Sequence, residues 1–345
     1  MLPVRTLRGP SRVRAHLFGA ALGVVAVALG SPTSHAQETP NPSELPPQFA
    51  YNYGETETAR AGGMAGALRA AGGAATAIYQ NPANLGLTRI YHIDALGQFT
   101  PEAGRHLYGG SIVDSTRRFS GAFSFVGGFQ DGEGVDRSSI DLRAALGFAI
   151  SDAFHVGVAG RYLSLQQEGL GVLGDSRASG GSREEGDPTQ REALVSTFNF
   201  DAGVTVRATD ELHVSVVGTN LTYRDNALMP TTVGGGIAWA TEDFTIEVDG
   251  LADFNSWSEV SPRVMAGGEY LIAGRVPVRL GYRFDALAGS GLTPSHQIAG
   301  GAGYLDPRFG VQAGVRRTLA GPSATTILVQ AGVYLESLGL GVSQP

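Results

Sequence analysis

Residues 59–85 read ARAGGMAGALRAAGGAATAIYQNPANL, and this stretch separates two parts of the chain that differ in composition. Its many glycines allow positive φ and tight reversals, which predicts short helical turns broken at the Gly-Gly pairs. Bulky apolar side chains are scarce and Arg60 and Arg69 interrupt the run, which argues against a membrane-spanning helix. We therefore expect a compact knot of small residues over 59–89.

The residues before this stretch are typical of an exported leader followed by a spacer. A basic start, an apolar run over 17–29 and the sequence Ser34-His35-Ala36 indicate a signal peptide over residues 1–36. The apolar run is too short for a stable membrane anchor. Residues 37–58 are rich in proline and acids, which predicts an extended periplasmic spacer or the start of a plug.

The overall composition is typical of a transmembrane β-barrel. Glycine is abundant at 50 residues, charged residues make up only 17%, and the mean hydropathy is close to zero. Such averages arise when each strand mixes lipid-facing apolar residues with lumen-facing polar ones. The net charge of −7 argues against nucleic acid as a partner, and the lack of cysteine excludes disulfides and thiol chemistry.

From residue 90 onward, alternation of apolar and polar residues predicts an all-β chain of about fourteen strands. Most of them hold about ten residues or more, which is enough for a tilted strand to cross a bilayer and longer than strands of soluble proteins. The expected strands are 90–100, 105–114, 118–129, 137–150, 154–166, 192–207, 211–222, 231–240, 243–254, 258–272, 275–285, 294–305, 308–317 and 324–336. The barrel is thus expected over 90–337, with a tail over 338–345.

The links between these strands alternate in length. Short links such as 151–153 and 208–210 follow the even-numbered strands, and longer ones, above all 167–191, follow the odd-numbered strands. Residues 255–257 are an exception, because this link after an odd-numbered strand is as short as the turns. Outer-membrane barrels have short periplasmic turns and longer outer loops, so we expect 167–191 outside the cell and the C-terminus in the periplasm.

The alternation also predicts which side chains face the lumen. In 140–150, Ile140, Leu146 and Phe148 are expected to face lipid, and the residues between them to point inward. The same rule places eleven charged side chains in the lumen. They are Asp141, Arg143, Arg161, Asp201, Glu247, Asp249, Arg263, Glu269, Arg279, Arg283 and Arg316.

The motif Asn81-Pro82-Ala83, which follows the Gly/Ala-rich stretch and precedes the first strand, resembles the N-terminal region of the FadL/TodX family of outer-membrane channels for hydrophobic compounds. The resemblance implies a transmembrane antiparallel β-barrel of fourteen strands whose N-terminal segment folds into the lumen as a hatch over 59–89. It implies that Asn81, Pro82 and Ala83 anchor the hatch. The apolar contacts expected beside them are Ile78, Tyr79 and Leu85.

No catalytic or metal-binding pattern accompanies this organisation. The histidines are dispersed without metal-ligand spacing, and neither His-Glu-x-x-His nor Gly-x-Ser-x-Gly occurs. One lumen pair, His155 with Asp201, has residue types found in barrel hydrolases, but interior charges of barrels usually pair for stability or line water. We expect no enzyme activity, no cofactor and no metal.

The resemblance implies passive uptake of small hydrophobic molecules, such as long-chain fatty acids, across the outer membrane of a Gram-negative bacterium. The expected partners are outer-membrane lipid, a hydrophobic small-molecule ligand and the barrel-assembly machinery. Two alternatives remain open. The polar 167–191 loop favours a protein-binding scaffold or shuttle of a secretion system, as in the related PorV-like barrels, and the other alternative is a porin for polar solutes.

Overall fold

The computed structural model describes residues 55–132, 135–168, 191–222, 229–257, 259–321 and 323–335. The expected signal peptide over 1–36, the spacer up to residue 54 and the tail over 338–345 lie outside the described residues. Most of the expected outer loop over 167–191 lies outside them as well.

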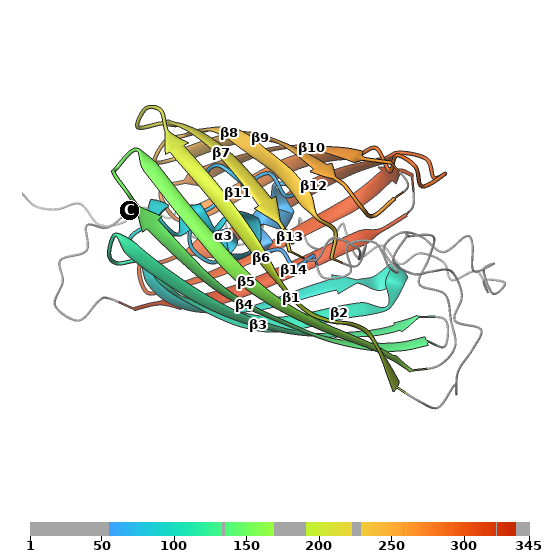
Figure 1. Ribbon diagram of the computed structural model, residues 1–345. Helices are drawn as coiled ribbons and strands as arrows, with labels where there is room; N and C mark the ends of the chain where they lie inside the picture. The colour runs from blue at the N-terminus through green and yellow to red at the C-terminus, as the bar shows by residue number, and fades with distance from the viewer. Residues whose placement is uncertain are drawn as a thin grey trace, which may run out of the picture. The chain divides into compact units, whose positions relative to one another are not determined.

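The described chain forms a closed antiparallel barrel of fourteen strands, which confirms the predicted fold class (Figure 1). Each strand pairs with its neighbours in sequence, and β1 closes the barrel by pairing with β14 from His92↔Tyr334 to Phe99↔Ile327. The strands are β1 Tyr91–Thr100, β2 Arg105–Asp114, β3 Phe119–Gly132, β4 Val135–Ala149, β5 Phe154–Glu168, β6 Arg191–Arg207, β7 Leu212–Thr219, β8 Thr232–Ala240, β9 Phe244–Asp253, β10 Ser261–Ile272, β11 Val276–Asp285, β12 Ser295–Leu305, β13 Phe309–Ala320 and β14 Thr325–Tyr334.

In the described part of the chain, helical structure is confined to short pieces. Helices α2 (Ala59–Gly63) and α3 (Ala75–Gln80) and the 3₁₀ helix η4 (Pro82–Leu87) precede the barrel, and η5 (Pro101–Ala103) links β1 to β2. This confirms the expected short turns: α2 ends on Gly62-Gly63, and Gly72-Gly73 lies between α2 and α3. None of the helices in the described chain is long and apolar enough to cross a membrane.

The strands alternate between an apolar outer face and a polar inner face, as predicted. On β4 the outward side chains of Ile140, Leu146 and Phe148 are 45–47% exposed, whereas Asp141 and Arg143 are at most 5% exposed. The outer face can therefore meet lipid while the inner face binds polar and small groups of the chain itself. Because the ladder closes on itself, no strand edge is left in the membrane.

The alternation of link lengths is only partly as predicted. Turns after the even-numbered strands hold three or four residues, in line with the prediction. The prediction of a short link at 255–257 was wrong. Because β10 begins only at Ser261, the link spans 254–260. Its Trp257 packs against Leu287. The link expected over 130–136 is also shorter, since β3 and β4 extend to Gly132 and Val135.

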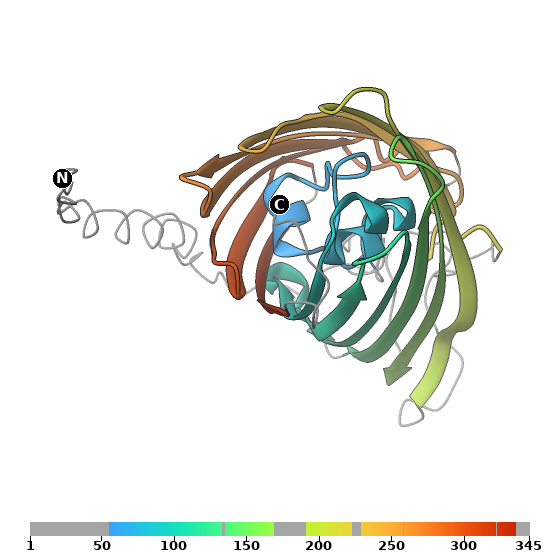
Figure 2. The same cartoon turned by 90° about the vertical axis from the view of Figure 1, so that its left-hand side faces the viewer.

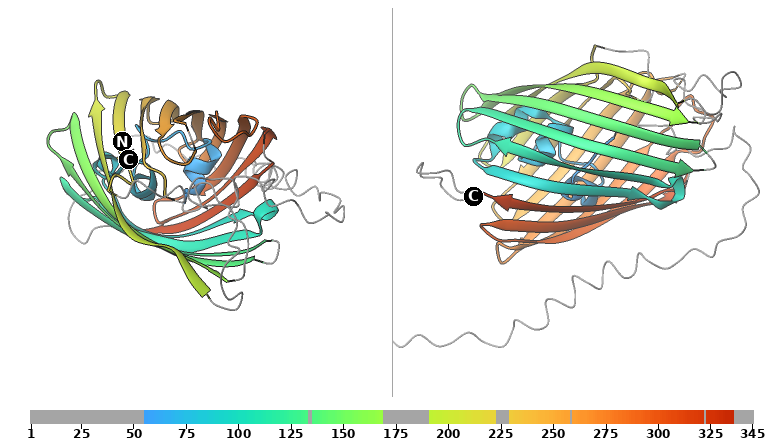
Figure 3. Two further views of the ribbon diagram at one scale, coloured as in Figure 1. Left: turned by 45° about the vertical axis from the view of Figure 1, so that its right-hand side comes forward. Right: turned by 90° about the horizontal axis from the view of Figure 1, so that it is seen from below.

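The residues before β1 lie inside the barrel. In Figure 2 the blue segment is surrounded by the strands, and the two views of Figure 3 agree. Helix α2 contacts β11 to β14, and η4 contacts β3 to β6 on the opposite wall. We call residues 55–90 the lumenal segment.

Candidate functional site

The lumenal segment crosses the barrel interior from one end to the other. Glu55 lies beside Arg263, close to the link that precedes β10, whereas Pro82 lies beside Gly157, close to the short turn that precedes β5. The segment therefore starts near the end that carries the odd-numbered links and enters β1 at the end with the short turns. Residues 55–58, expected in the spacer, belong to the lumenal segment, since Glu57 and Thr58 are buried inside the barrel.

The Asn-Pro-Ala motif forms the junction between the lumenal segment and the wall. Asn81 begins η4, where its Oδ1 accepts a hydrogen bond from the Ala83 N–H at 3.1 Å, and Pro82 occupies the first turn, where no backbone N–H is needed. The Asn81 Nδ2 donates to the Arg69 carbonyl oxygen at 2.9 Å and to Thr205 Oγ1 of β6 at 3.0 Å. Asn84 binds the same two partners: its Nδ2 donates to the Arg69 carbonyl oxygen at 2.9 Å, and its Oδ1 accepts from Thr205 Oγ1 at 2.6 Å.

Glycines on the inner face of β4, β5 and β6 make room for this junction. A Cβ at Gly157 would lie 2.6 Å from the Pro82 carbonyl oxygen, and closer still to Pro82 C and Ala83 N. A Cβ at Gly203 would collide with Asn81 Oδ1. The motif thus sits in a recess that only glycine leaves open.

The apolar residues expected beside the motif pack against one half of the wall. Ile78, Tyr79 and Leu85 are buried in one cluster with inward apolar side chains of β1 to β5, among them Leu96, Leu107, Val113 and Val126. The Arg143 guanidinium lies 5.0 Å from the Tyr79 ring centroid. Burial raises the pKa of the Tyr79 hydroxyl well above its usual value.

Ion pairs hold the first residues of the lumenal segment to β10, β11 and β13. Glu55 lies 3.4 Å from Arg263 and 3.3 Å from Arg283, and Glu57 pairs with Arg316. Burial alone raises the pKa of Glu55, but the guanidinium groups of Arg283, Arg263 and Arg316 outweigh it and hold that pKa well below its usual range. Glu55 therefore acts as a charged anchor of the segment.

A second ion-pair group fixes α2. Glu269 of β10 accepts from Arg60 Nη2 at 2.8 Å and also pairs with Arg279 of β11. Burial lowers the pKa of the Arg60 guanidinium, but Glu269 outweighs that effect and the pKa is raised. Around this group the backbone of α2 approaches the wall closely, since a Cβ at Gly314 would lie 2.7 Å from the Ala59 carbonyl oxygen.

Two buried carboxylates of β9 bind the loop between α2 and α3. Asp249 Oδ2 accepts from the backbone N–H groups of Leu68 and Arg69, both at 3.1 Å, and from Arg69 Nη1 at 3.2 Å. Glu247 Oε1 accepts from the Ala70 N–H, and its Oε2 from the Ala71 N–H at 2.9 Å. The two side chains of β9 thus satisfy four consecutive N–H groups that no helix satisfies.

A third charge cluster lines a cavity beside the lumenal segment. Asp141 Oδ2 accepts from Arg143 Nη2 at 3.0 Å and from Arg161 Nη2 at 2.9 Å. Asp201 accepts from the N–H of Asn220 at 2.7 Å, at the point where β7 ends and Asn220 takes the left-handed conformation with φ of 53°.

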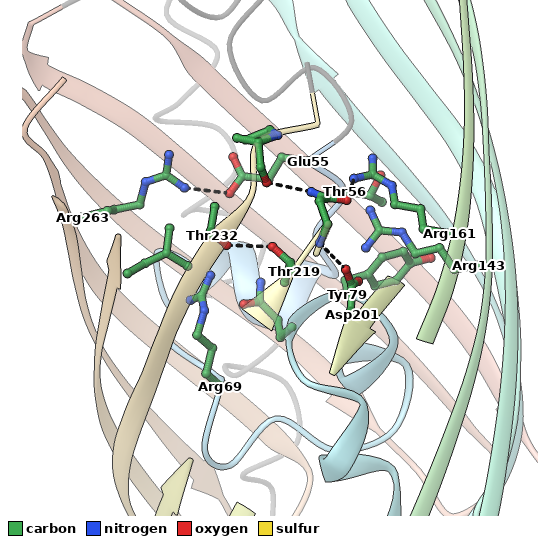
Figure 4. A pocket seen from close by; sticks show the side chains of 14 residues that line it. Glu55, Thr56, Arg69, Tyr79, Arg143, Arg161, Asp201, Thr219, Thr232 and Arg263 are labelled. Carbon is green, nitrogen blue, oxygen red and sulfur yellow. Dashed lines mark hydrogen bonds and ion pairs between the residues drawn. The ribbon is translucent and has the colours of Figure 1, made fainter. Parts of the chain in front are cut away.

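This cavity has a volume of about 70 Å³ and a polar wall (Figure 4). Arginines from the lumenal segment and from β4, β5 and β10 face it, and each has an acidic partner: Arg69 with Asp249, Arg143 and Arg161 with Asp141, and Arg263 with Glu55 and Asp285. The space is far smaller than the several hundred Å³ typical of ligand pockets.

The pair with hydrolase-like residue types, His155 and Asp201, is not brought together. His155 Nε2 lies 3.3 Å from the Asp152 carbonyl oxygen, and its Nδ1 has no hydrogen-bond partner. Asp201 instead binds the N–H of Asn220. Between these two described residues no hydrogen bond forms, so the geometry offers no base–acid pair there.

Sequence reasoning missed several residues of this site. Glu55 and Glu57 lie in a segment predicted as a spacer or the start of a plug, and neither was named as a site residue. Thr205 and Gly157 look like ordinary strand residues, and only the docked motif reveals their role. Arg69 was noted only as an interruption of the Gly/Ala stretch, yet it contacts both β9 and the Asn-Pro-Ala motif.

The closed ladder, the apolar outer face and the filled polar lumen define a transmembrane β-barrel with an internal N-terminal segment. No protein-family model matches the sequence. No curated protein matches it either.

Solved structures do match, over four fifths of the chain. The chain is similar to the CymD monoaromatic hydrocarbon channel, with a TM-score of 0.63 and 14% identity, over 81% of this chain and 97% of that one. It is similar to the Ralstonia pickettii toluene transporter TbuX, with a TM-score of 0.60 and 11% identity, over 82% and 99%. It is also similar to a Pseudomonas aeruginosa FadL homologue, with a TM-score of 0.59 and 12% identity, over 81% and 98%. The resemblance to FadL/TodX-type barrels is confirmed at the level of the fold.

Proposed function

We propose that this protein is a channel in the outer membrane of a Gram-negative bacterium for passive uptake of small hydrophobic molecules. The lumenal segment is its hatch. Monoaromatic hydrocarbons and long-chain fatty acids are the candidate ligands, the first from the printed descriptions of barrels with the same fold and the second from the resemblance of the Asn-Pro-Ala motif. The observation that carries the proposal is a barrel whose lumen is filled by its own N-terminal residues, 55–90.

The conformation described here supports a closed state. The cavity of about 70 Å³ is too small for a toluene or fatty-acid molecule with its contacts, so passage requires the lumenal segment to move. A lumen closed in this way favours a gated channel over a permanently open porin for polar solutes.

An apolar surface is available to a ligand once the segment moves. Ile78, Tyr79 and Leu85 cover inward apolar side chains of β1 to β5, including Leu96 and Leu107. A hydrophobic molecule that takes the place of Ile78 and Tyr79 recovers the same burial of apolar area. Ile78, Tyr79 and Leu85 are therefore the proposed ligand contacts. Asn81, Pro82 and Ala83 are the proposed hatch anchor.

Uptake into liposomes tests this function. Purified protein in liposomes should admit labelled toluene or a labelled fatty acid and should cause little swelling in sugar solutions. Fast sugar swelling would instead identify a polar-solute porin. If neither class of solute is taken up, a protein-binding scaffold is the remaining function. That function would be tested by identifying the proteins that co-purify with the barrel.

Location and orientation need a separate measurement in cells. The proposal expects the protein in the outer-membrane fraction after insertion by the barrel-assembly machinery. A tag near Gly180, in the link that lies outside the described residues, should be reachable on intact cells, and a tag at Asp152 in the β4–β5 turn should not. Labelling of Asp152 alone would reverse the orientation.

A further inference from the structure

Residues 68–71 are held to the wall by hydrogen bonds to two carboxylates, whereas the Asn-Pro-Ala motif is held mainly by shape. Residues 64–67, just before them, are also held by shape, since Met64 lies against Gly267 and Ala67 packs with Leu251 of β9. Residues 70 and 71 are alanines, and Leu68 packs within the lumenal segment itself. The main attachment of residues 68–71 to β9 is therefore the set of hydrogen bonds to Glu247 and Asp249.

The two carboxylates are fully buried, and both oxygens of Glu247 already accept a hydrogen bond from the loop. Glu247 and Asp249 are each 0% exposed, and the two oxygens of Glu247 are each used by one N–H, from Ala70 and Ala71. If either oxygen is lost as an acceptor, one N–H is left without a partner at a buried position. Such a loss costs more than the hydrogen bond itself contributes.

Residues 81–85 are attached in a different way. Pro82 and Ala83 rest in the glycine recess of β4 and β5, and Leu85 lies in the apolar cluster. The hydrogen bonds of Asn81 and Asn84 to Thr205 are uncharged. None of these contacts depends on Glu247 or Asp249.

Arg69 connects the two parts. Its carbonyl oxygen accepts from both Asn81 Nδ2 and Asn84 Nδ2 at 2.9 Å, while its own N–H and guanidinium bind Asp249. The motif therefore presents the 68–71 turn to the carboxylates of β9. A movement that frees this turn can pivot on Arg69 and leave the motif in its recess.

We infer that Glu247 and Asp249 are the latch of the channel: they hold residues 68–71 against β9, and the channel opens when this turn leaves β9 while residues 81–85 stay docked. The inference rests on the proposed gated channel and specifies which contacts regulate it. The two carboxylates act as positioning residues, since they bind the hatch and not the transported molecule.

Replacement of Glu247 by glutamine isolates the latch. The amide keeps the size of the side chain but has one acceptor oxygen, and its NH₂ group faces an N–H donor. Either the Ala70 or the Ala71 N–H then loses its partner, and the loop is released more often. Glu242→Gln is the matched control, because Glu242 is an exposed residue of the turn that leads into β9.

Thiol labelling reads the movement directly, since the natural chain has no cysteine. Single cysteines are placed at Ala70 in the loop and at Ala83 in the motif, both 0% exposed. The protein is inserted in liposomes without any hydrophobic ligand, and the rate of reaction with a small charged thiol reagent is measured. Heat-modifiable migration confirms a folded barrel in every variant.

In the Glu247→Gln background, the cysteine at position 70 should react about tenfold faster or more, as expected when a buried N–H loses its hydrogen-bond partner, and the cysteine at position 83 should not change. An unchanged labelling rate at position 70 overturns the latch. An equal rise at positions 70 and 83 overturns it as well, because the whole lumenal segment then leaves the wall. If Glu247→Gln does not fold, Asp249→Asn decides by the same criteria. Because no transport is measured, the result is independent of whether the channel carries hydrophobic molecules.

Discussion

Substitution of Gly157 by alanine should open the channel by a second route, departure of the Asn-Pro-Ala motif from its recess, without weakening the barrel. The added methyl group would lie 2.6 Å from the Pro82 carbonyl oxygen and closer to two further backbone atoms, whereas carbon contacts in proteins are comfortable at about 3.5–4.0 Å. The wall is held on both sides by the β4 and β6 ladders, so the Asn-Pro-Ala turn is the part that must shift.

The size of the effect follows from overpacking. An extra methyl group in a close-packed site costs about 1–3 kcal/mol, and this cost falls on every conformation in which residues 81–85 are docked. The ratio of docked to undocked motif then drops roughly 5- to 150-fold, and an undocked motif leaves the lumen open. Gly250→Ala is the matched control, because Gly250 also lies within a strand, β9, and a Cβ there meets nothing within 4 Å.

Planar-bilayer conductance measures this change, with heat-modifiable migration as the test of folding. Gly157→Ala should show larger or more frequent openings than the natural protein, and Gly250→Ala should match the natural protein. Equal conductance of the two variants, both folded, would refute the placement of Pro82 against β5 and with it the role of the glycine recess.

Three further changes test the barrel and the hatch. Leu146→Arg puts a charge on the lipid face at a cost of about 2–4 kcal/mol and should reduce the folded fraction in membranes. Thr232→Arg, at the polar cavity, should reduce the folded fraction less. Equal folded fractions of the two variants would contradict the assignment of faces. Deletion of residues 59–77 should leave a heat-resistant barrel with raised conductance and antibiotic sensitivity, and an unchanged conductance would place the segment outside the lumen. Because the pKa of Glu55 lies below its usual range, its ion pairs are fully present above the ordinary glutamate pKa of about 4.3 and are lost only as the pH falls through the lower, folded-state value. Between about pH 8 and pH 5, Glu55 should therefore contribute no change in conductance, so the natural protein and Glu55→Gln should show the same pH dependence there, and an opening near pH 6 that Glu55→Gln abolishes would be inconsistent with this pairing.

Most of the barrel could be predicted from the sequence because two solvents shape every strand. Lipid outside and polar groups inside impose a period of two that continues for the whole width of the membrane, so β2 was predicted at its observed bounds, 105–114. The prediction failed where the chain leaves the membrane. The start of β10 was predicted at 258, but the strand begins only at Ser261, and Trp257 of the link before it packs against Leu287.

The lumenal segment could be located from the sequence, but its partners could not. Asn81 contacts Thr205 across 124 residues, and Glu57 pairs with Arg316 across 259. Local composition carries no information about such distant pairs. The resemblance of the Asn-Pro-Ala motif identified the junction, whereas the glycines that receive it, Gly157 and Gly203, look no different in sequence from glycines that face open space.

The division of hydrogen bonds explains how one chain can be both a rigid wall and a movable hatch. Within the described residues, the strands satisfy one another's backbone groups all around the barrel. The hydrogen bonds between residues 55–89 and the strands each involve at least one side chain, as at Asn81, Glu247 and Asp249. Movement of the segment therefore breaks no rung of the ladder, and the free energy of opening depends on a small number of side-chain contacts. Single substitutions at the latch or in the glycine recess can change gating while the barrel remains folded.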